Sequence, residues 1–230
     1  VERNISKAIK IYSYSAINGY KDSMLALGVI FSDGKFIERN IEKAIKFLSD
    51  NSVSLFIKGS LFYEGKYVKR DIQKAIKIFK NSSNLNNCYA KNNLGIIFRN
   101  GIQVQKNLTW SIEYFTEAIK IDNNDFVLSY NLAHILFFEE KTVDLDKLIQ
   151  LLIHSANRKL ICAFELLCLI VYNEFGYSQD GRKKFKEKYD SESWESLAND
   201  VFNYINIEIN NSSAYEYLYE KIKNTQLIYI

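Results

Sequence analysis

The chain has 230 residues, of which 47% are hydrophobic and 25% charged, and it contains no proline, so its composition is globular and favours uninterrupted helices over rigid Pro-rich linkers. Its 30 Lys and Arg residues are mixed with 27 Asp and Glu residues, without the concentrated basic stripe typical of nucleic-acid-binding proteins. No run of eighteen apolar residues and no signal peptide is visible, so we expect no membrane span in this segment. The three scattered cysteines favour a reducing compartment, and we expect a cytoplasmic location.

Five predicted helix starts follow one another along the chain. Each is an Asn or Asp followed by an aliphatic residue, at Asn4, Asn40, Asp71, Asn107 and Asp144. These side chains accept hydrogen bonds from the free N–H groups of a helix's first turn, so each one marks the beginning of a helix. The starts are about 31 to 37 residues apart, a period that is typical of stacked helical pairs.

Each predicted helix then repeats a pattern of small and bulky residues. A small residue lies three positions after the aliphatic one at Ala8, Ala44, Ala75 and Ser111, with Leu148 as the exception. A small side chain at this position allows a neighbouring helix to approach closely. Bulky pairs such as Phe47 and Leu48 follow, and we expect them to supply the buried area.

A second sequence motif, with two glycines six positions apart, precedes three of these helix starts. The pairs are Gly28 and Gly34, Gly59 and Gly65, and Gly95 and Gly101. The second glycine suits the left-handed residue just past a helix end. The first lies inside a helix, where glycine costs about 1 kcal/mol relative to alanine, and we expect close packing against the small residue of the following helix to offset that cost.

These phrases resemble a known repeat family. The segment "SAINGYKDSMLALGVIFSDGKFIERNIEKAIKFL", residues 15–48, is similar to the Sel-one-like repeat, a relative of the tetratricopeptide repeat. The matching positions are Ala16, Gly19, Leu27, Gly28, Gly34, Lys43 and Ala44. The similarity extends over residues 1–120, but residues 48–56 are about five residues short and Lys58 replaces the leucine before the glycine. We therefore expect a shortened helix or a tightened junction there.

Beyond Ser111 the pattern drifts. Residues 117–136 are more similar to a tetratricopeptide repeat, residues 155–174 resemble a degenerate one, and the phrase is lost after Gly176. We predict a repeat array of about five repeats over residues 1–175, the first one partial, and a divergent helical capping region over residues 176–230. The resemblance implies an all-α, right-handed α-solenoid of stacked antiparallel helix pairs that binds proteins.

No residue pattern typical of catalysis stands out. His134 and His154 lie in apolar helical neighbourhoods and are expected to pack or to line a groove. Cys162 and Cys168 are six positions apart on one predicted helix, so they do not share a face well, and Cys88 has no neighbouring base. Phosphate-binding loops and nucleophile elbows are absent. We therefore expect neither an enzyme nor a cofactor nor a metal site.

The resemblance also suggests where a partner binds, because in this repeat class the first helix of each repeat lines the inner curve. By spacing, the residues expected there are Asn92, Asn93, Ile96, Arg99, Tyr130, Asn131 and His134. Asn93 and Asn131 occupy equivalent places, and an asparagine offers both a donor and an acceptor to a peptide backbone. We predict a non-catalytic scaffold or adaptor that binds a peptide or protein segment in this groove.

Alternatives remain open from the sequence. The polar row is also what an Asn-rich chain would show as ordinary exposed residues. The chain starts at Val1 in the middle of a repeat, so we expect it to be a piece of a longer protein, and it could serve as the regulatory segment of a larger signalling enzyme. An RNA-binding helical repeat would need a cationic groove, which the mixed charges disfavour.

Overall fold

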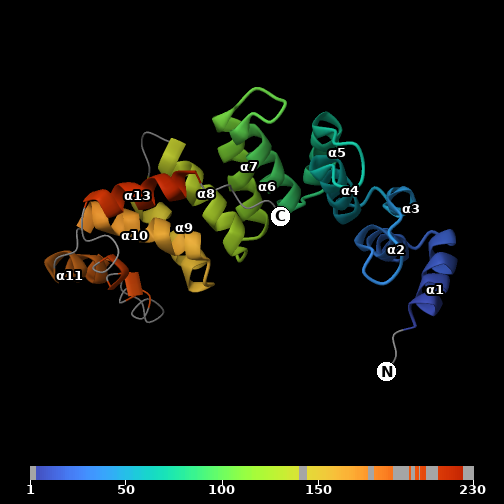
Figure 1. Ribbon diagram of the computed structural model, residues 1–230, viewed down its shortest axis with the longest axis horizontal. Coiled ribbons are helices and arrows are strands. Elements are labelled where there is room, and N and C mark those ends of the chain that lie inside the picture. The colour runs from blue at the N-terminus through green and yellow to red at the C-terminus, as the bar shows by residue number, and fades with distance from the viewer. Residues whose placement is uncertain are drawn as a thin grey trace. The chain divides into compact units, whose positions relative to one another are not determined.

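The structure is a computed structural model that describes residues 4–139, 144–175, 179–188, 197, 200, 201, 203–205 and 212–224. Every element with defined bounds in this part of the chain is an α-helix, which confirms the all-α prediction (Figure 1). The chain divides into two compact units, unit 1 up to Ile121 and unit 2 from Asp122 onward. The predicted boundary between repeat array and capping region, at residue 176, lies outside the described residues and stays a prediction.

Unit 1 consists of helices packed in consecutive pairs. They are α1 (Ile5–Ile17), α2 (Lys21–Asp33), α3 (Ile41–Phe47), α4 (Ser52–Glu64), α5 (Ile72–Asn84), α6 (Cys88–Asn100) and α7 (Leu108–Ile121). The pairs α2 and α3, α4 and α5, and α6 and α7 correspond to the three repeats with two glycines, and α5 also packs against α6. The first helix of each repeat is thus the one that carries the internal glycine.

Unit 2 continues with α8 (Phe126–Glu139), α9 (Leu145–Asn157), α10 (Ile161–Phe175), α11 (Gln179–Lys188) and α13 (Ser212–Lys223). Helix α9 packs against both α8 and α10, and α10 also contacts α11 and α13. In α11, Lys183 and Lys184 are exposed while Phe185 is fully buried, so the basic segment at this point is a solvated helix face.

The five predicted helix starts are confirmed by their hydrogen bonds. The Oδ1 atoms of Asn4, Asn40, Asp71 and Asn107 each accept an N–H three residues later at 2.9 Å. Asp144 accepts the N–H of Lys147 at 3.1 Å. Asn51 and Asn87 cap the first helices α4 and α6 in the same way, at 2.8 Å, and these two caps were not predicted.

Asp71→Ala should lower the free energy of unfolding by about 1 kcal/mol, because it leaves the N–H of Lys74 without its partner. Asp71→Asn should change it little, since asparagine fills the equivalent position at Asn40 and Asn107. Denaturant midpoints of the three proteins measure the difference. An alanine variant as stable as the parent would show that this cap contributes nothing.

The loop between the two helices of a repeat is closed by a recurring set of contacts. The backbone N–H of the cap residue donates to a phenylalanine carbonyl in the preceding helix, at 2.9 Å from Asn40 to Phe31 and at 3.0 Å from Asp71 to Phe62. Asn107 repeats the bond to Phe98 at 2.9 Å. The loop therefore returns to the same point of the first helix in all three repeats.

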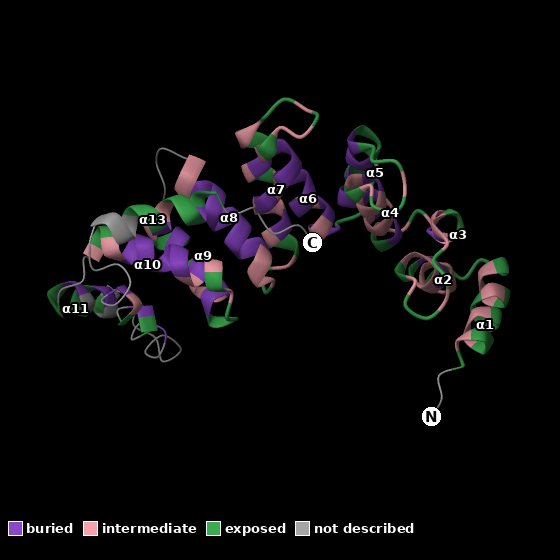
Figure 2. Cartoon of the chain, viewed as in Figure 1, coloured by how far each residue is buried: buried purple, intermediate pink, exposed green. Residues whose placement is uncertain are grey.

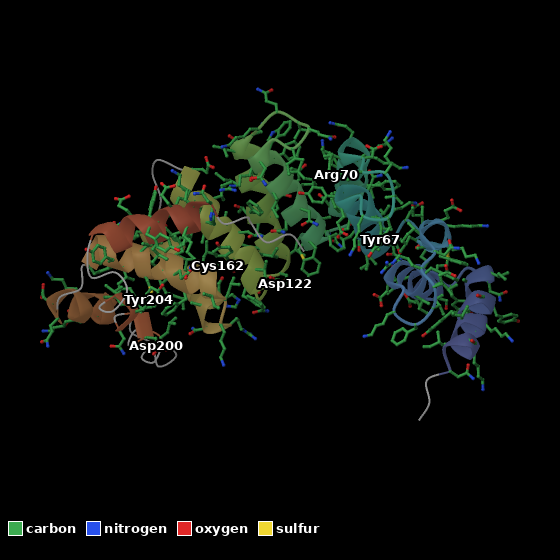
Figure 3. The ribbon with its side chains drawn as sticks, viewed as in Figure 1. Tyr67, Arg70, Asp122, Cys162, Asp200 and Tyr204 are labelled. Atoms are coloured by element: carbon green, nitrogen blue, oxygen red, sulfur yellow. The ribbon has the colours of Figure 1, made fainter. Side chains whose placement is uncertain are left out.

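An arginine before the cap completes this closure, and the sequence analysis had assigned it no role. Arg39 Nε donates to the Ser32 carbonyl at 2.7 Å, and Arg70, which Figure 3 labels, donates from its Nε to the Tyr63 carbonyl at 2.9 Å. Both bonds satisfy carbonyl groups left open at a helix end. The arginine stem packs on the second glycine, which adopts φ values of 67° at Gly34 and 66° at Gly65. The left-handed residue predicted here is confirmed.

The predicted packing partner of the internal glycine is confirmed in part. The small residue of the following helix does contact Gly95, because Ser111 Oγ donates to the Gly95 carbonyl at 2.7 Å, but the nearest neighbour in all three repeats is the bulky residue one turn later. A Cβ atom added at Gly28 would lie 2.6 Å from Leu48 Cδ2, one at Gly59 would lie 2.7 Å from Phe79 Cδ1, and one at Gly95 would lie 2.8 Å from Phe115 Cε1. These large side chains lie directly against the glycine backbone, and this contact offsets the cost of glycine in the helix.

The shortened element predicted in the second repeat is present. Helix α3 has 7 residues, whereas its counterparts α5 and α7 have 13 and 14. It ends because Leu48 adopts an extended conformation, with ψ of 104°. Even so, Leu48 keeps its contact with Gly28, so the deletion removed the end of the helix and preserved its packing residue.

Candidate protein-binding surfaces

The four groove residues predicted in α6 are mostly inaccessible. Asn92 and Asn93 are fully buried, Ile96 is nearly so, and Arg99 is half-buried. Asn92 Nδ2 donates to Asn93 Oδ1 at 3.3 Å. Figure 2 shows α6 as a largely buried helix. In this arrangement only Arg99 of the four presents part of its side chain to solvent.

The equivalent positions in α2 and α4 are more open, and we call the face they form the inner face of unit 1. Val29, one residue after the internal glycine of α2, is 43% exposed. In α4, Phe56, Ile57, Ser60 and Tyr63 are half-buried. Burial raises the pKa of the Tyr63 hydroxyl, which the nearby Arg70 opposes. Sequence reasoning missed these positions because it selected polar side chains, and this part of the face is mainly apolar.

The three groove residues predicted in α8 are fully buried. The rings of Tyr130 and His134 meet edge to face at 5.8 Å, and His134 lies 4.7 Å from the ring of Phe138. Burial raises the pKa of the Cys162 thiol in α10, and the neighbouring Tyr130 opposes this rise. Asn131, on α8 like Tyr130, is also fully buried. We call the side of α8 and α10 that carries Tyr130, His134 and Cys162 the α8–α10 face.

Helix α13 covers the α8–α10 face. His134 Nε2 lies 3.1 Å from the carbonyl oxygen of Ile222, and because a carbonyl only accepts, Nε2 carries the proton. The rings of Tyr219 and Phe138 are 5.4 Å apart. Lys221 Nζ pairs with Glu165 Oε1 at 2.5 Å. The predicted groove residue His134 thus lies beside a helix that comes from much later in the chain.

Glu165, Tyr219 and Lys221 are interface residues that the sequence analysis missed. Glu165 had a visible signal, because it is the one charged residue between Ile161 and Asn173 in a strongly apolar helix. A buried carboxylate among apolar residues requires a partner. Nothing in the sequence, however, indicated that the partner is Lys221.

A second open surface of unit 1 surrounds Trp110, which is 49% exposed. It occupies the place of Lys43 and Lys74 in the earlier repeats, and its ring packs edge-on against Phe98 at 5.1 Å. Two hollows of about 280 and 370 Å³ flank it. They share Lys80 and Trp110, and the first also holds Lys91, Glu113, Tyr114 and Glu117, while the second holds Gln73, Ile76, Phe98, Val104, Gln105, Lys106 and Asn107.

In the described part of the chain, no three His, Cys, Asp or Glu residues come together to hold a metal ion. Nor is any single described helix long and apolar enough to span a membrane, although α10 and α11 together, as a bent pair, would be by length and composition alone.

Stability should fall as the pH rises above 9.0, the ordinary pKa of the thiol of Cys168. Burial raises the pKa of Cys168 well above this value, and the nearby Glu165 adds to the effect. The unfolded chain therefore loses the thiol proton first, and the free energy of unfolding decreases until the folded thiol also ionises. Denaturant midpoints between pH 8 and 10 measure this decrease. Because tyrosines titrate nearby, the control is Cys168→Ala, whose decrease should be smaller; parallel curves would exclude a contribution from Cys168.

Comparisons with known proteins agree with this architecture. The family model of the Sel1 repeat matches residues 1–20, 21–49, 59–87 and 88–123. The gap between these matches, residues 50–58, follows the shortened helix α3, and residues 124–230 are not matched. No curated protein matches the chain.

Two solved structures share the fold. The crystal structure of a Sel1 repeat protein from Oxalobacter formigenes has a TM-score of 0.68 and 17% identity, covering 87% of this chain and 81% of that one. The protective antigen c5321 of uropathogenic Escherichia coli, which displays an SLR fold, has a TM-score of 0.67 and 19% identity over 93% of this chain. The aligned region spans 48% of the antigen's length. With four consecutive family matches and this shared solenoid of helix pairs, the chain belongs to the Sel1-repeat family, as the resemblance had predicted.

Proposed function

We propose that the chain is a non-catalytic interaction module that binds a segment of a partner protein on its first helices. The observation that carries this proposal is α13 on the α8–α10 face. That face supplies a hydrogen-bond donor, a carboxylate and aromatic rings to a helix from outside the stacked pairs. A surface with these groups has the chemistry that helix recognition in grooves requires.

The described histidines and cysteines support a non-catalytic role. His134 is fully buried and donates to a backbone carbonyl, and His154 Nε2 lies 2.9 Å from the carbonyl oxygen of Asn124. Burial raises the pKa values of Cys162 and Cys168, so both thiols stay protonated near neutral pH. These two histidines and two cysteines therefore provide no activated nucleophile beside a base. A protein or peptide partner, without nucleic acid, and a cytoplasmic location remain our expectations.

In unit 1, the first helices expose side chains to a partner mainly on the inner face. Val29 is exposed, and the aromatic residues Phe56 and Tyr63 are half-buried. Half-buried aromatic residues supply much of the binding energy at protein interfaces. We therefore propose that an extended or helical segment with apolar side chains binds across α2 and α4.

The test begins with capture of partners on the immobilised chain by cross-linking, followed by affinity measurements with the purified partner. Val29→Asp and Ser60→Asp should each weaken binding at least about tenfold, because they place a charge on the inner face. Asn81→Asp, on the exposed surface of α5, is the matched control and should bind like the parent. Alanine at Asn93 or Asn131 would test packing rather than contact, since both side chains are fully buried.

The Trp110 surface is the alternative location for the partner, and a second variant distinguishes it. Trp110→Lys restores the residue of the earlier repeats, so the chain should still fold, with a loss of about 0.5–1.5 kcal/mol from the edge-on contact with Phe98. If Trp110→Lys abolishes binding while Val29→Asp and Ser60→Asp bind like the parent, the partner binds the surface around Trp110 and the inner-face proposal is wrong.

A further inference from the structure

Helix α13 departs from the order of a stacked-repeat array. In such arrays each helix contacts its neighbours in the sequence. Helix α11 follows this rule, since Phe185 packs against Phe175 at the end of α10, with ring centroids 5.3 Å apart. Helix α13 instead lies against α10 and reaches α8, where Ile222 is 88 residues away in sequence from His134.

We propose that α13 is an internal ligand of the α8–α10 face, displaced by a helix of a partner protein that carries the same pattern of apolar and basic residues. This inference rests on the proposed function and adds to it the chemistry of the partner and a form of autoinhibition. Three kinds of contact define the pattern.

The first contact is a charge pair. The side chain of Glu165 is only 11% exposed, and Lys221 Nζ lies 2.5 Å from its Oε1 atom. The residues on the C-terminal side of Glu165, Leu166 to Val171, are all buried and apolar or sulfur-containing. A carboxylate in such surroundings is strongly disfavoured without a cation beside it. Any helix that replaces α13 must therefore bring a lysine or arginine to this position.

The second and third contacts set the direction and the apolar side of the helix. The Ile222 carbonyl belongs to the last turn of α13, where carbonyl groups lack partners within the helix, and His134 donates to it. Tyr219 packs against Phe137 and Phe138 with ring centroids 6.4 and 5.4 Å away. Leu218 and Ile222, four positions apart, are buried on the same side. The ligand is thus an amphipathic helix with two aliphatic residues, an aromatic residue and a basic residue near its end.

The described side chains of α13, from Glu216 onward, include few buried apolar ones, which makes the helix exchangeable. Among its described side chains only Leu218 and Ile222 are buried, and Tyr217 is 74% exposed. Helix α5, by comparison, buries Ile72, Ala75, Ile76 and Phe79 together with two serines. Elements with few buried apolar contacts open before the rest of a structure.

The experiment uses the full chain and a fluorescein-labelled peptide with the sequence of residues 212–224, followed by fluorescence anisotropy. The peptide should bind the Lys221→Glu chain at least about tenfold more tightly than the parent, because repulsion from Glu165 loosens the internal helix. A peptide carrying Lys221→Glu should bind the Glu165→Lys chain and not the Lys221→Glu chain. Tyr217→Glu, which adds a negative charge at a 74% exposed position of the same helix, is the matched control and should leave peptide binding as in the parent.

Hydrogen exchange of the parent chain provides a measurement that needs no variant. The amides of α13 should exchange well before those of α9 and α10, whereas equal protection would make α13 a fixed part of the core and overturn the inference. Equal affinity of the peptide for parent and Lys221→Glu chains would also overturn it. So would a Lys221→Glu chain that unfolds as a whole, or one that forms dimers by light scattering, since a second copy would then be the occupant.

The outcomes also separate this inference from the proposed function. If no chain binds the peptide but a captured partner loses affinity for Val29→Asp and Ser60→Asp, the proposed function stands and the inference about α13 fails. If the peptide binds as expected and no partner responds to those two substitutions, the internal ligand stands and the inner-face assignment in unit 1 fails.

Discussion

Gly95→Leu is expected to lower the free energy of unfolding by about 2–4 kcal/mol, because even the first atom of a side chain at this position would lie 2.8 Å from the ring of Phe115. Phe115 is fully buried and has no room to move away, so the helices α6 and α7 must separate. The change is measured as a shift of the denaturant midpoint together with loss of helical signal in circular dichroism.

Two further variants test whether this loss comes from the contact. Asn100→Leu places the same side chain at an exposed position of α6 and should leave stability nearly unchanged. In the double variant Gly95→Leu with Phe115→Ala, the combined loss should be smaller than the sum of the single losses, because the ring no longer opposes the leucine. Strict additivity would show that the two residues are not in contact and that the assigned register is wrong.

Phe79→Ala is expected to destabilise the chain by about 3–5 kcal/mol, the loss typical of a phenylalanine removed from a closed core. Phe79 is fully buried, and its ring lies against Gly59, with Phe56 at 6.1 Å and Tyr63 at 6.4 Å between ring centroids. Removing the ring leaves a cavity that these neighbours cannot fill without moving the backbone of α4.

Phe79→Leu is the matched control, because Leu48 occupies the equivalent position in the preceding repeat, against Gly28. It should cost less than about 1.5 kcal/mol, since leucine keeps most of the buried volume. Both values come from denaturant titration. If the leucine variant loses as much stability as the alanine variant, the two repeats do not share this packing position.

The elements of the repeats could be predicted because their signals are local. A cap such as Asn40 acts on an N–H three residues away, and a left-handed glycine such as Gly34 acts on the helix that it ends. The shortened α3 was visible as missing residues in one repeat of an otherwise constant pattern. Each of these interactions lies within a few residues of its cause, so the sequence itself contains both partners side by side.

The candidate site could not be predicted in the same way. Spacing correctly placed Tyr130 and His134 together on α8, with rings 5.8 Å apart, but it could not reveal that α13 contacts His134. That contact depends on the path of a chain segment 88 residues away. The bulky partner of the internal glycines was also missed, because a single turn separates Ala75 from Phe79 and the spacing fits either residue. The small residue was correctly placed at Gly95, whose carbonyl accepts a hydrogen bond from Ser111.

The closed loop within each repeat has a consequence for how such proteins change in length. Gly34 to Asn40, Gly65 to Asp71, and Gly101 to Asn107 are equal intervals, and in each the cap N–H returns to the phenylalanine carbonyl of the preceding helix. An inserted or deleted residue in this loop would break that bond. The junction that leads to the next repeat has a closure of its own, in which the N–H groups of Tyr20, Asn87 and Leu160 donate to the carbonyl groups of Ser15, Ser82 and Ser155 at 3.2–3.3 Å. The shortened α3 instead ends at Leu48, whose N–H donates to the Ala44 carbonyl, so this second junction tolerates a change of length. Gene duplications that join at this second junction would add whole helix pairs with their loops intact, so the array grows or shrinks by repeats while each loop keeps its length.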